Sequence, residues 1–277
     1  MKIKKSYLVA GGVTAIFALL AVLFGLYDLN ITLSVVHMEN RFGMALEYLG
    51  VLIAPFLAMY FGTVICVYYY KSSNTLRRIP KLIAGILVVL ASICYCCYIY
   101  SALSNLESLA AVILTGILWM VSAVWLLMQS CDALYEQLKI AWTAVIYIAF
   151  VLIVINLLKA CWGRVRFREM ENDFALFTPW YLPQGFTGHT SFPSGHTANA
   201  ASLYVITMFA ALSAKTWKKV LCYLIPVLWI CAMAVSRVLV GAHFASDVLF
   251  GAGIAVVLFY LSKWLIFKRV FYKRPQA

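Results

Sequence analysis

The feature that most constrains this chain is a series of long apolar stretches that recurs from one end of the sequence to the other. Short polar or charged segments separate these stretches. A helix needs about 20 mostly apolar residues to cross a bilayer, and several stretches reach that length. We therefore predict membrane-spanning helices near residues 8–28, 47–70, 82–102, 108–129, 140–159, 197–213, 220–240 and 246–267.

The composition favours a membrane protein over a soluble one. Hydrophobic residues make up 65% of the 277 residues, charged residues make up 12%, and the mean hydropathy is +0.93. A soluble domain is about half apolar and about a quarter charged. We predict an all-α polytopic membrane bundle of about eight transmembrane helices, forming a single domain over residues 1–277. The apolar run that follows the basic start lacks a clear cleavage site, so we expect an uncleaved first span.

The distribution of basic residues predicts how the bundle is oriented. The formal net charge is +12, but the cations lie in short tracts between apolar stretches, which argues against a nucleic-acid partner. Cytoplasmic loops carry an excess of Lys and Arg. With the N-terminus inside, most basic residues fall on cytoplasmic segments, and both chain ends are cytoplasmic. The outer side then holds only Arg41, Lys159, Arg164, Arg166, Arg168 and Arg237.

Three short stretches place polar groups at the same predicted outer edge of different helices. The first runs from Lys159 to Arg166, the second is Pro193-Ser194-Gly195-His196, and the third runs from Ser236-Arg237 to Asp247. Their shared location predicts a functional site. Taken singly, each has a structural alternative: Lys159 as a snorkelling helix-end lysine, Arg237 and Asp247 as an interhelical ion pair, and His196 as a core histidine.

The third stretch predicts an oriented imidazole. If the chain is already helical from about Ala242, His243 and Asp247 lie on the same helix face. The carboxylate then accepts from one ring nitrogen and leaves the other as a nucleophilic lone pair. An aspartate within the reach of hydrocarbon also needs a partner of this kind.

The other two stretches predict a site for an anion such as a phosphate. Ser194 or Gly195 precedes a helix, where free backbone N–H groups favour an anion, and a protonated His196 can supply a proton to a leaving alkoxide. Lys159, Arg166 and Arg237 bring three cations to the same edge, as phosphoryl transfer requires. Because that edge lacks a dense carboxylate cluster, we predict no metal and no other cofactor.

The combined pattern Lys-x6-Arg, Pro-Ser-Gly-His and Ser-Arg-x5-His-x3-Asp, within residues 159–247, resembles the three signature motifs of the type 2 phosphatidic acid phosphatase superfamily. That superfamily includes lipid phosphate phosphatases, undecaprenyl pyrophosphate phosphatases, glucose-6-phosphatase and vanadium haloperoxidases. The resemblance implies a six-helix phosphatase core and a phosphohistidine on His243. It further implies that Asp247 orients His243 and that His196 protonates the leaving group. Phosphoryl oxygens would be held by Lys159, Arg166, Ser194, Gly195 and Arg237.

One position departs from the family pattern. Family members usually have a proline after the arginine of the first motif, whereas this chain has Phe167, which lacks the fixed φ that shapes the following loop. Arg164 and Arg168 are therefore rival candidates for the phosphate contact of Arg166.

The expected activity is metal-independent hydrolysis of a lipid phosphate or pyrophosphate, such as undecaprenyl pyrophosphate, phosphatidylglycerol phosphate or phosphatidate. The expected partners are this substrate and membrane lipids, in a bacterial cytoplasmic membrane with the site facing outward. An endoplasmic reticulum protein with a lumenal site would have the same topology. Three alternatives stay open: a lipid phosphotransferase that uses the same site, a non-catalytic transporter or binder of phosphorylated lipids, and a sugar-phosphate phosphatase.

Overall fold

A computed structural model describes residues 5–72, 75–103, 106–171 and 173–270. All regular structure in these ranges is helical. Seven segments are long and apolar enough to cross a membrane, judged by length and composition. The chain is thus an integral membrane protein of the predicted all-α class. The two ends of the predicted single domain, residues 1–4 and 271–277, lie outside the described residues.

The helices follow the predicted order of spans, although several are longer than expected. The α-helices and the shorter helical elements are α1 (Lys5–Val35), α2 (Arg41–Gly50), α3 (Ile53–Lys71), α4 (Thr75–Leu103), α5 (Leu106–Met128), α6 (Cys131–Trp162), η1 (Phe167–Glu169), η2 (Phe174–Leu176), α7 (Gly195–Ala200), η3 (Ala201–Leu212), α8 (Thr216–Leu239), α9 (Ala245–Leu265) and η4 (Ile266–Val270). The predicted span 197–213 corresponds to α7 followed directly by η3, and it is not among the seven long segments.

The predicted span 47–70 is divided in the structure into α2 and α3. Pro55 lies in the first turn of α3, where the lack of a backbone N–H is tolerated. Asn199 of α7 joins the two helices at the break: its Oδ1 accepts from the N–H of Ala54 at 3.1 Å, and its Nδ2 donates to the carbonyl of Val51 at 3.2 Å. A side chain distant in sequence therefore satisfies backbone groups that the break leaves free.

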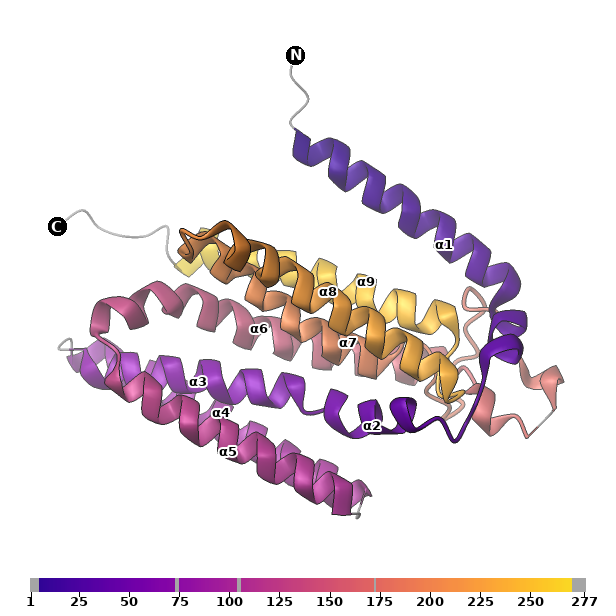
Figure 1. Ribbon diagram of the computed structural model, residues 1–277, viewed down its shortest axis with the longest axis horizontal. Helices are drawn as coiled ribbons and strands as arrows, with labels where there is room; N and C mark the ends of the chain where they lie inside the picture. Colours follow the sequence, from indigo (N-terminus) through magenta and orange to yellow (C-terminus); the bar gives the residue numbers. More distant parts are fainter. Residues whose placement is uncertain (1–4, 73–74, 104–105, 172, 271–277) are drawn as a thin grey trace.

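The core of the bundle lies where α3, α6, η3 and α9 meet (Figure 1). Tyr147 of α6 is fully buried there, and its hydroxyl donates to the carbonyl of Ala201 at 2.8 Å. Helix α4 packs against α3, and α5 contacts both. Helix α1 stands apart at its N-terminal end and contacts α9. Large apolar residues face outward along α1, as expected for a helix surrounded by lipid.

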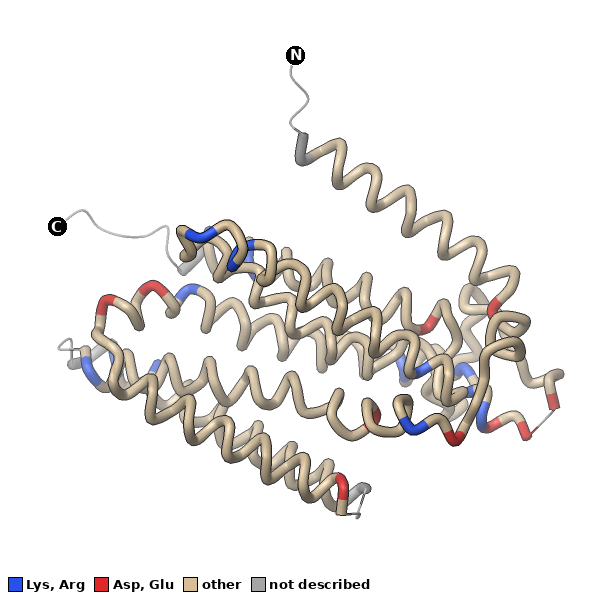
Figure 2. The backbone as a smooth tube through the Cα atoms, in the orientation of Figure 1, with Lys and Arg blue, Asp and Glu red and all other residues tan. Residues whose placement is uncertain are grey.

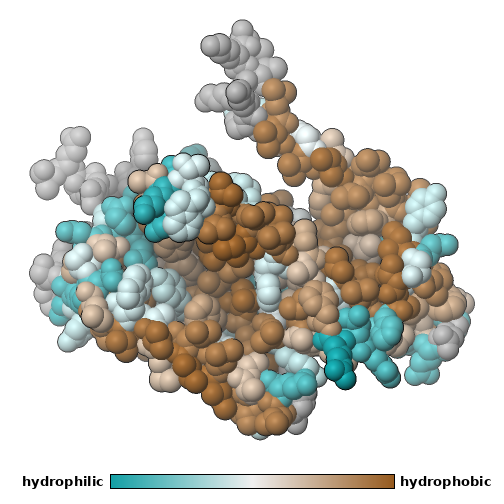
Figure 3. Space-filling model, viewed as in Figure 1, coloured by the Kyte–Doolittle hydropathy of each residue, from teal (hydrophilic) through white to brown (hydrophobic). Residues whose placement is uncertain are grey.

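Polar and apolar residues separate along the bundle. The long middle parts of the helices carry almost no charge, and the charged residues gather toward the two ends (Figure 2). The space-filling view shows apolar surface over the middle of the molecule (Figure 3). The segment between α6 and α7 folds over one end, beside the C-terminal part of α1 (Figure 1). We refer to this end as the site end.

Replacing Asn199 with alanine tests the junction between α2 and α3. Asn199→Ala should lower the free energy of unfolding by about 1–3 kcal/mol, because it leaves a buried N–H and a partly buried carbonyl without their partner. The measurement is unfolding of the purified protein in detergent micelles. Asn156→Ala is the matched control, because Asn156 is exposed and its side chain donates to the Leu152 carbonyl within its own helix. Equal stability of the two variants would contradict the proposed junction.

Candidate active site

Three local structures bring the predicted residues to the site end. Lys159 lies on the last turn of α6, which ends at Gly163 with φ of 64°, a conformation that favours glycine. A Cβ on Gly163 would lie 2.2 Å from the Gly185 carbonyl oxygen. His196 is the second residue of α7, whose N-cap is Ser194. His243 lies in the turn that joins α8 to α9.

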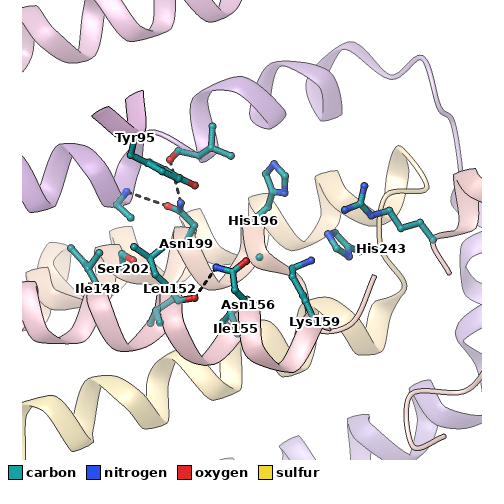
Figure 4. A pocket seen from close by; sticks show the side chains of 15 residues that line it. Tyr95, Ile148, Leu152, Ile155, Asn156, Lys159, His196, Asn199, Ser202 and His243 are labelled. Carbon is teal, nitrogen blue, oxygen red and sulfur yellow. Dashed lines mark hydrogen bonds between the residues drawn. The ribbon is translucent and has the colours of Figure 1, made fainter. Parts of the chain in front are cut away.

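These side chains surround a cavity of about 190 Å³. Figure 4 shows His196, His243 and Lys159 at one end of the cavity, with Ile148, Ser202 and Tyr95 toward the other. The ring centroids of His196 and His243 are 6.4 Å apart. Arg166 and Gly195 also line the cavity. Five of the eight predicted site residues therefore share one space.

Two cations are held over this cavity by the loop that follows α6. Lys159 Nζ donates to the Thr190 carbonyl at 2.5 Å, and Arg166 Nη2 donates to the Thr190 hydroxyl at 3.0 Å. Glu169 forms an ion pair with Arg166 at 3.5 Å. Arg166 Nε is buried and has no hydrogen-bond partner among the described residues. Arg166 thus retains a free donor, and buried donors generally have partners.

The geometry of His243 differs from the predicted helix face. Helix α9 begins at Ala245, so His243 precedes the N-cap Phe244 and is not itself helical. The chain still brings His243 Nδ1 to 3.5 Å from Asp247 Oδ2, longer than a hydrogen bond. Asp247 Oδ2 accepts instead from the Ser191 hydroxyl at 2.5 Å and from the Phe244 N–H at 2.9 Å.

Burial controls the protonation of both histidines, neither of which lies in the seven spanning segments. Burial lowers the pKa of His243 to about 4. Burial also lowers the pKa of His196 well below its usual range, and the neighbouring Arg237 cation adds to this effect. Both imidazoles are therefore neutral near pH 7 in the ligand-free protein, since desolvation disfavours a charged ring.

Arg164, predicted as a rival phosphate contact, lies in a buried charge cluster and does not line the cavity. Its Nη1 is 2.6 Å from Asp247 Oδ1, and its Nη2 is 3.0 Å from Asp28 Oδ2. Its Nε donates to the Thr178 carbonyl at 2.8 Å. Asp28 was not among the predicted site residues, although, like Asp247, it is a carboxylate at a spanning helix and requires a partner.

Two other predicted phosphate contacts, Arg237 and Ser194, do not line the cavity. Arg237 is fully buried, forms an ion pair with Glu47 at 3.1 Å and donates to the Gly43 carbonyl of α2. It does not pair with Asp247, which excludes the structural alternative considered for these two residues. The Ser194 hydroxyl accepts from the N–H of Thr197 at 3.3 Å and caps α7. Arg168, the second rival, lies 3.6 Å from Glu47.

Among the residues that the structure describes, no group of three or more His, Cys, Asp or Glu side chains is placed to hold a metal ion. Carboxylate-rich clusters are the usual ligands of Mg²⁺ and Ca²⁺. A metal-independent reaction stays a prediction, to be tested below.

Comparison with known proteins finds a family match for the segment that holds most of these residues. Residues 140–271 match the PAP2 superfamily, which confirms the resemblance indicated by the three motifs. Phosphatidylglycerophosphatase B of Bacillus subtilis is 38% identical over 88 residues, which are 31% of this chain and 43% of that protein. Lipid A 1-phosphatase of Rhizobium johnstonii is 29% identical over 132 residues, which are 45% of this chain and 48% of that protein.

The chain therefore spans less than half the length of these two curated relatives. No solved structure matches the chain. Helices α1 to α5 precede the segment that matches the family, and α1 supplies Asp28 to the charge cluster beside Asp247.

Replacing Arg164 with leucine tests the charge cluster. Arg164→Leu should lower the free energy of unfolding by about 3–5 kcal/mol, because it leaves Asp28 and Asp247 buried without their shared cation. Unfolding in detergent micelles measures the effect. Arg168→Leu is the control, since the partly exposed pair of Arg168 with Glu47 should contribute about 1 kcal/mol or less. A loss no larger for Arg164→Leu than for the control would refute the assignment.

Proposed function

We propose that this chain, through the PAP2 segment at residues 140–271, is a membrane phosphatase that hydrolyses a lipid phosphate or lipid pyrophosphate through a phosphohistidine. The observation that carries the proposal is the buried imidazole of His243 and the partly buried imidazole of His196, with ring centroids 6.4 Å apart at one cavity with Lys159 and Arg166. A phosphoryl group between the rings would contact a nucleophile and a proton donor, with cations beside its oxygens.

In the proposed first step, the lone pair of His243 Nε2 forms a bond to phosphorus while the bond to the leaving oxygen breaks. The neutral state of His243 near pH 7 keeps this lone pair available. Asp247 faces Nδ1 at 3.5 Å, and this contact should shorten when the ring becomes positive, since catalytic hydrogen bonds often tighten only in the complex.

His196 has two roles in the proposed cycle. A bound phosphate places negative charge beside His196, which favours the protonated ring, and the leaving oxygen then receives that proton. In the second step, water attacks phosphorus, His196 accepts a proton from the water, and the nitrogen–phosphorus bond breaks. Inorganic phosphate and the dephosphorylated lipid are the products.

The charge of the phosphoryl oxygens would be stabilised mainly by Lys159 and by Arg166, whose Nε is free. Gly195 lines the cavity, and the Ser194 cap fixes the position of its backbone. Arg237 would have to release Glu47 to contact the phosphoryl group directly. These cations would do the electrostatic work that metal ions perform in other phosphoryl-transfer sites.

A lipid-borne substrate is supported by a second cavity, which we call the apolar chamber. It encloses about 270 Å³ and is lined by residues of α3, α4 and α6, including Ala58, Val88 and Ala149. Ala54, Tyr95, Ile148 and Leu152 line both cavities. A hydrocarbon chain in this chamber would begin next to the phosphate, as an amphiphilic substrate requires.

The proposed location is a bacterial cytoplasmic membrane, with both chain ends cytoplasmic and the site on the outer face. This orientation is supported by the excess of Lys and Arg on the opposite side of the predicted topology. The proposed substrates are undecaprenyl pyrophosphate, phosphatidylglycerol phosphate and phosphatidate. The name of the Rhizobium relative adds lipid A 1-phosphate to this group.

Phosphate release from purified protein in detergent with EDTA present tests the reaction. The substrates are an isoprenyl pyrophosphate, phosphatidylglycerol phosphate, phosphatidate and glucose 6-phosphate. Wild-type protein should release phosphate from at least one lipid, and His243→Ala should lose at least about 10³-fold in kcat, since the nucleophile is removed. The control is His37→Ala, because His37 is exposed and lines neither cavity.

Each alternative has its own outcome in this assay. Retained turnover in His243→Ala would refute the nucleophile, and loss of wild-type activity in EDTA would refute the metal-independent mechanism. A lipid phosphotransferase would release phosphate only slowly until an acceptor lipid is added. A transporter or binder would bind the lipid without turnover, and a sugar-phosphate phosphatase would prefer glucose 6-phosphate.

Filling the apolar chamber tests whether it holds the substrate tail. Ala149→Trp should lower kcat/KM on long-chain phosphatidate on the order of tenfold by occupying the chamber, and leave activity on a short-chain phosphatidate within about twofold. Leu157→Trp is the control, because Leu157 is on the same helix, is exposed and lines neither cavity. An equal effect on both chain lengths would rule out the chamber as the tail site.

A further inference from the structure

Helix α1 contributes a buried carboxylate to the neighbourhood of the site, although it lies outside the segment that matches the PAP2 superfamily. Asp28 is 1% exposed. A charged side chain within a spanning helix is expensive, and such residues usually have a functional reason to be there. The mechanism described above gives Asp28 no role.

The contacts of Asp28 favour an ionised carboxylate. Its Oδ1 accepts from the Ser246 N–H at 2.9 Å. Its Oδ2 accepts from Arg164 Nη2 at 3.0 Å and from the Ser246 hydroxyl. The Ser246 N–H and the Arg164 guanidinium can only donate, and donors of this kind favour the charged form of a carboxylate. Asp28 therefore bonds to Ser246, which directly precedes Asp247, and to Arg164, which contacts Asp247.

Arg164 couples Asp28 to Asp247 because its guanidinium is held in one position. The guanidinium carbon lies 4.2 Å from the centroid of the Phe244 ring and 5.4 Å from that of Phe177. The donor Nη1 reaches both the Ser246 hydroxyl at 2.8 Å and Asp247 Oδ1 at 2.6 Å. A planar guanidinium with fixed donors allows little variation in the positions of its partners. A change at Asp28 would therefore act on Asp247.

The charges of the cluster give a reason for a second carboxylate. Asp28 and Asp247 share the single cation Arg164, so the three residues carry one net negative charge. If Arg164 faced Asp247 alone, the pair would be neutral and would attract a positive ring less strongly. With Asp28 present, the cluster as a whole is net negative toward His243, whose Nδ1 lies 3.5 Å from Asp247 Oδ2.

We propose that Asp28 of α1 is a positioning residue for the phosphoryl-transfer centre: through Arg164 and Ser246 it fixes Asp247, and its charge leaves the cluster net negative toward His243. This inference rests on the proposed function. It makes α1 part of the reaction centre, although no side chain of α1 lines the cavity. Asp28 would stabilise the site mainly when His243 becomes positively charged. Phosphate binding would depend on Lys159 and Arg166 instead.

The test compares Asp28→Asn with Asp28→Glu in detergent, with phosphatidate or whichever lipid the wild-type protein hydrolyses best. Asp28→Asn keeps the side-chain shape and removes the charge. It should lower kcat by roughly tenfold or more, the loss typical of partners that orient a functional group. KM and the inhibition constant of inorganic phosphate should stay within about twofold. Asp28→Glu, which restores the charge, should recover most of the lost kcat.

Thr32→Val is the matched control on α1. Thr32 is also fully buried, but its hydroxyl donates only to the Asp28 carbonyl within the same helix. This variant should keep the wild-type kcat, which separates the charge of Asp28 from the packing of α1. If Asp28→Asn does not fold, Ser246→Ala decides the question: it removes the hydroxyl that joins Asp28 to α9, and kcat should fall with KM unchanged.

Wild-type kcat in folded Asp28→Asn would overturn the inference, as would a parallel loss of kcat and phosphate binding with no recovery in Asp28→Glu. If Asp28→Asn does not fold, wild-type kcat in Ser246→Ala would overturn it. These results leave the proposed function intact, because the wild-type protein remains active. A wild-type protein that releases no phosphate from any lipid in the panel would overturn the proposed function and this inference with it.

Discussion

Burial of charge at one end of an apolar bundle is the constraint on which the rest of this structure depends. Arg164 and Asp247 are 1% and 0% exposed, and Asp28 completes the group. Separating any one of them from its partners would leave an unpaired charge in a medium of low dielectric, which is far more costly than losing an apolar contact. The cluster therefore holds together α1, the loop after α6 and the start of α9.

Much of the fold was predictable because the bilayer dictates it. Apolar stretches of sufficient length can satisfy their backbone groups in lipid only as helices, and the predicted spans correspond to helices in the structure. The division between α2 and α3 was not predictable from hydropathy, because residues 47–70 are apolar on both sides of the break. It depends on Asn199, whose amide bonds to both sides of the junction. Such a contact between distant residues leaves no local pattern in the sequence.

The candidate site, too, was only partly predictable from the sequence. Motif spacing indicated Lys159, Arg166, Gly195, His196 and His243, which line one cavity. Spacing could not reveal the partners of the buried arginines. Arg164 and Arg166 are separated by one residue and have the same charge, yet Arg164 bonds to two carboxylates while Arg166 lines the cavity. The course of the loop after Gly163 decides which arginine faces the cavity. Similarly, the start of α9 at Ala245 depends on a cap made by the Asp247 side chain.

The contact between Asp28 and Ser246 joins positions 218 residues apart, and this separation has a consequence for how the protein is assembled. Helix α1 is synthesised before Arg164 and Ser246, which emerge only after several later helices. During that interval, a carboxylate in an apolar helix has neither of its final partners. Helix α1 can therefore reach its final position only after α9 has been made. Completion of the charge cluster would thus be one of the last steps of folding, at which the first and last long helices become joined.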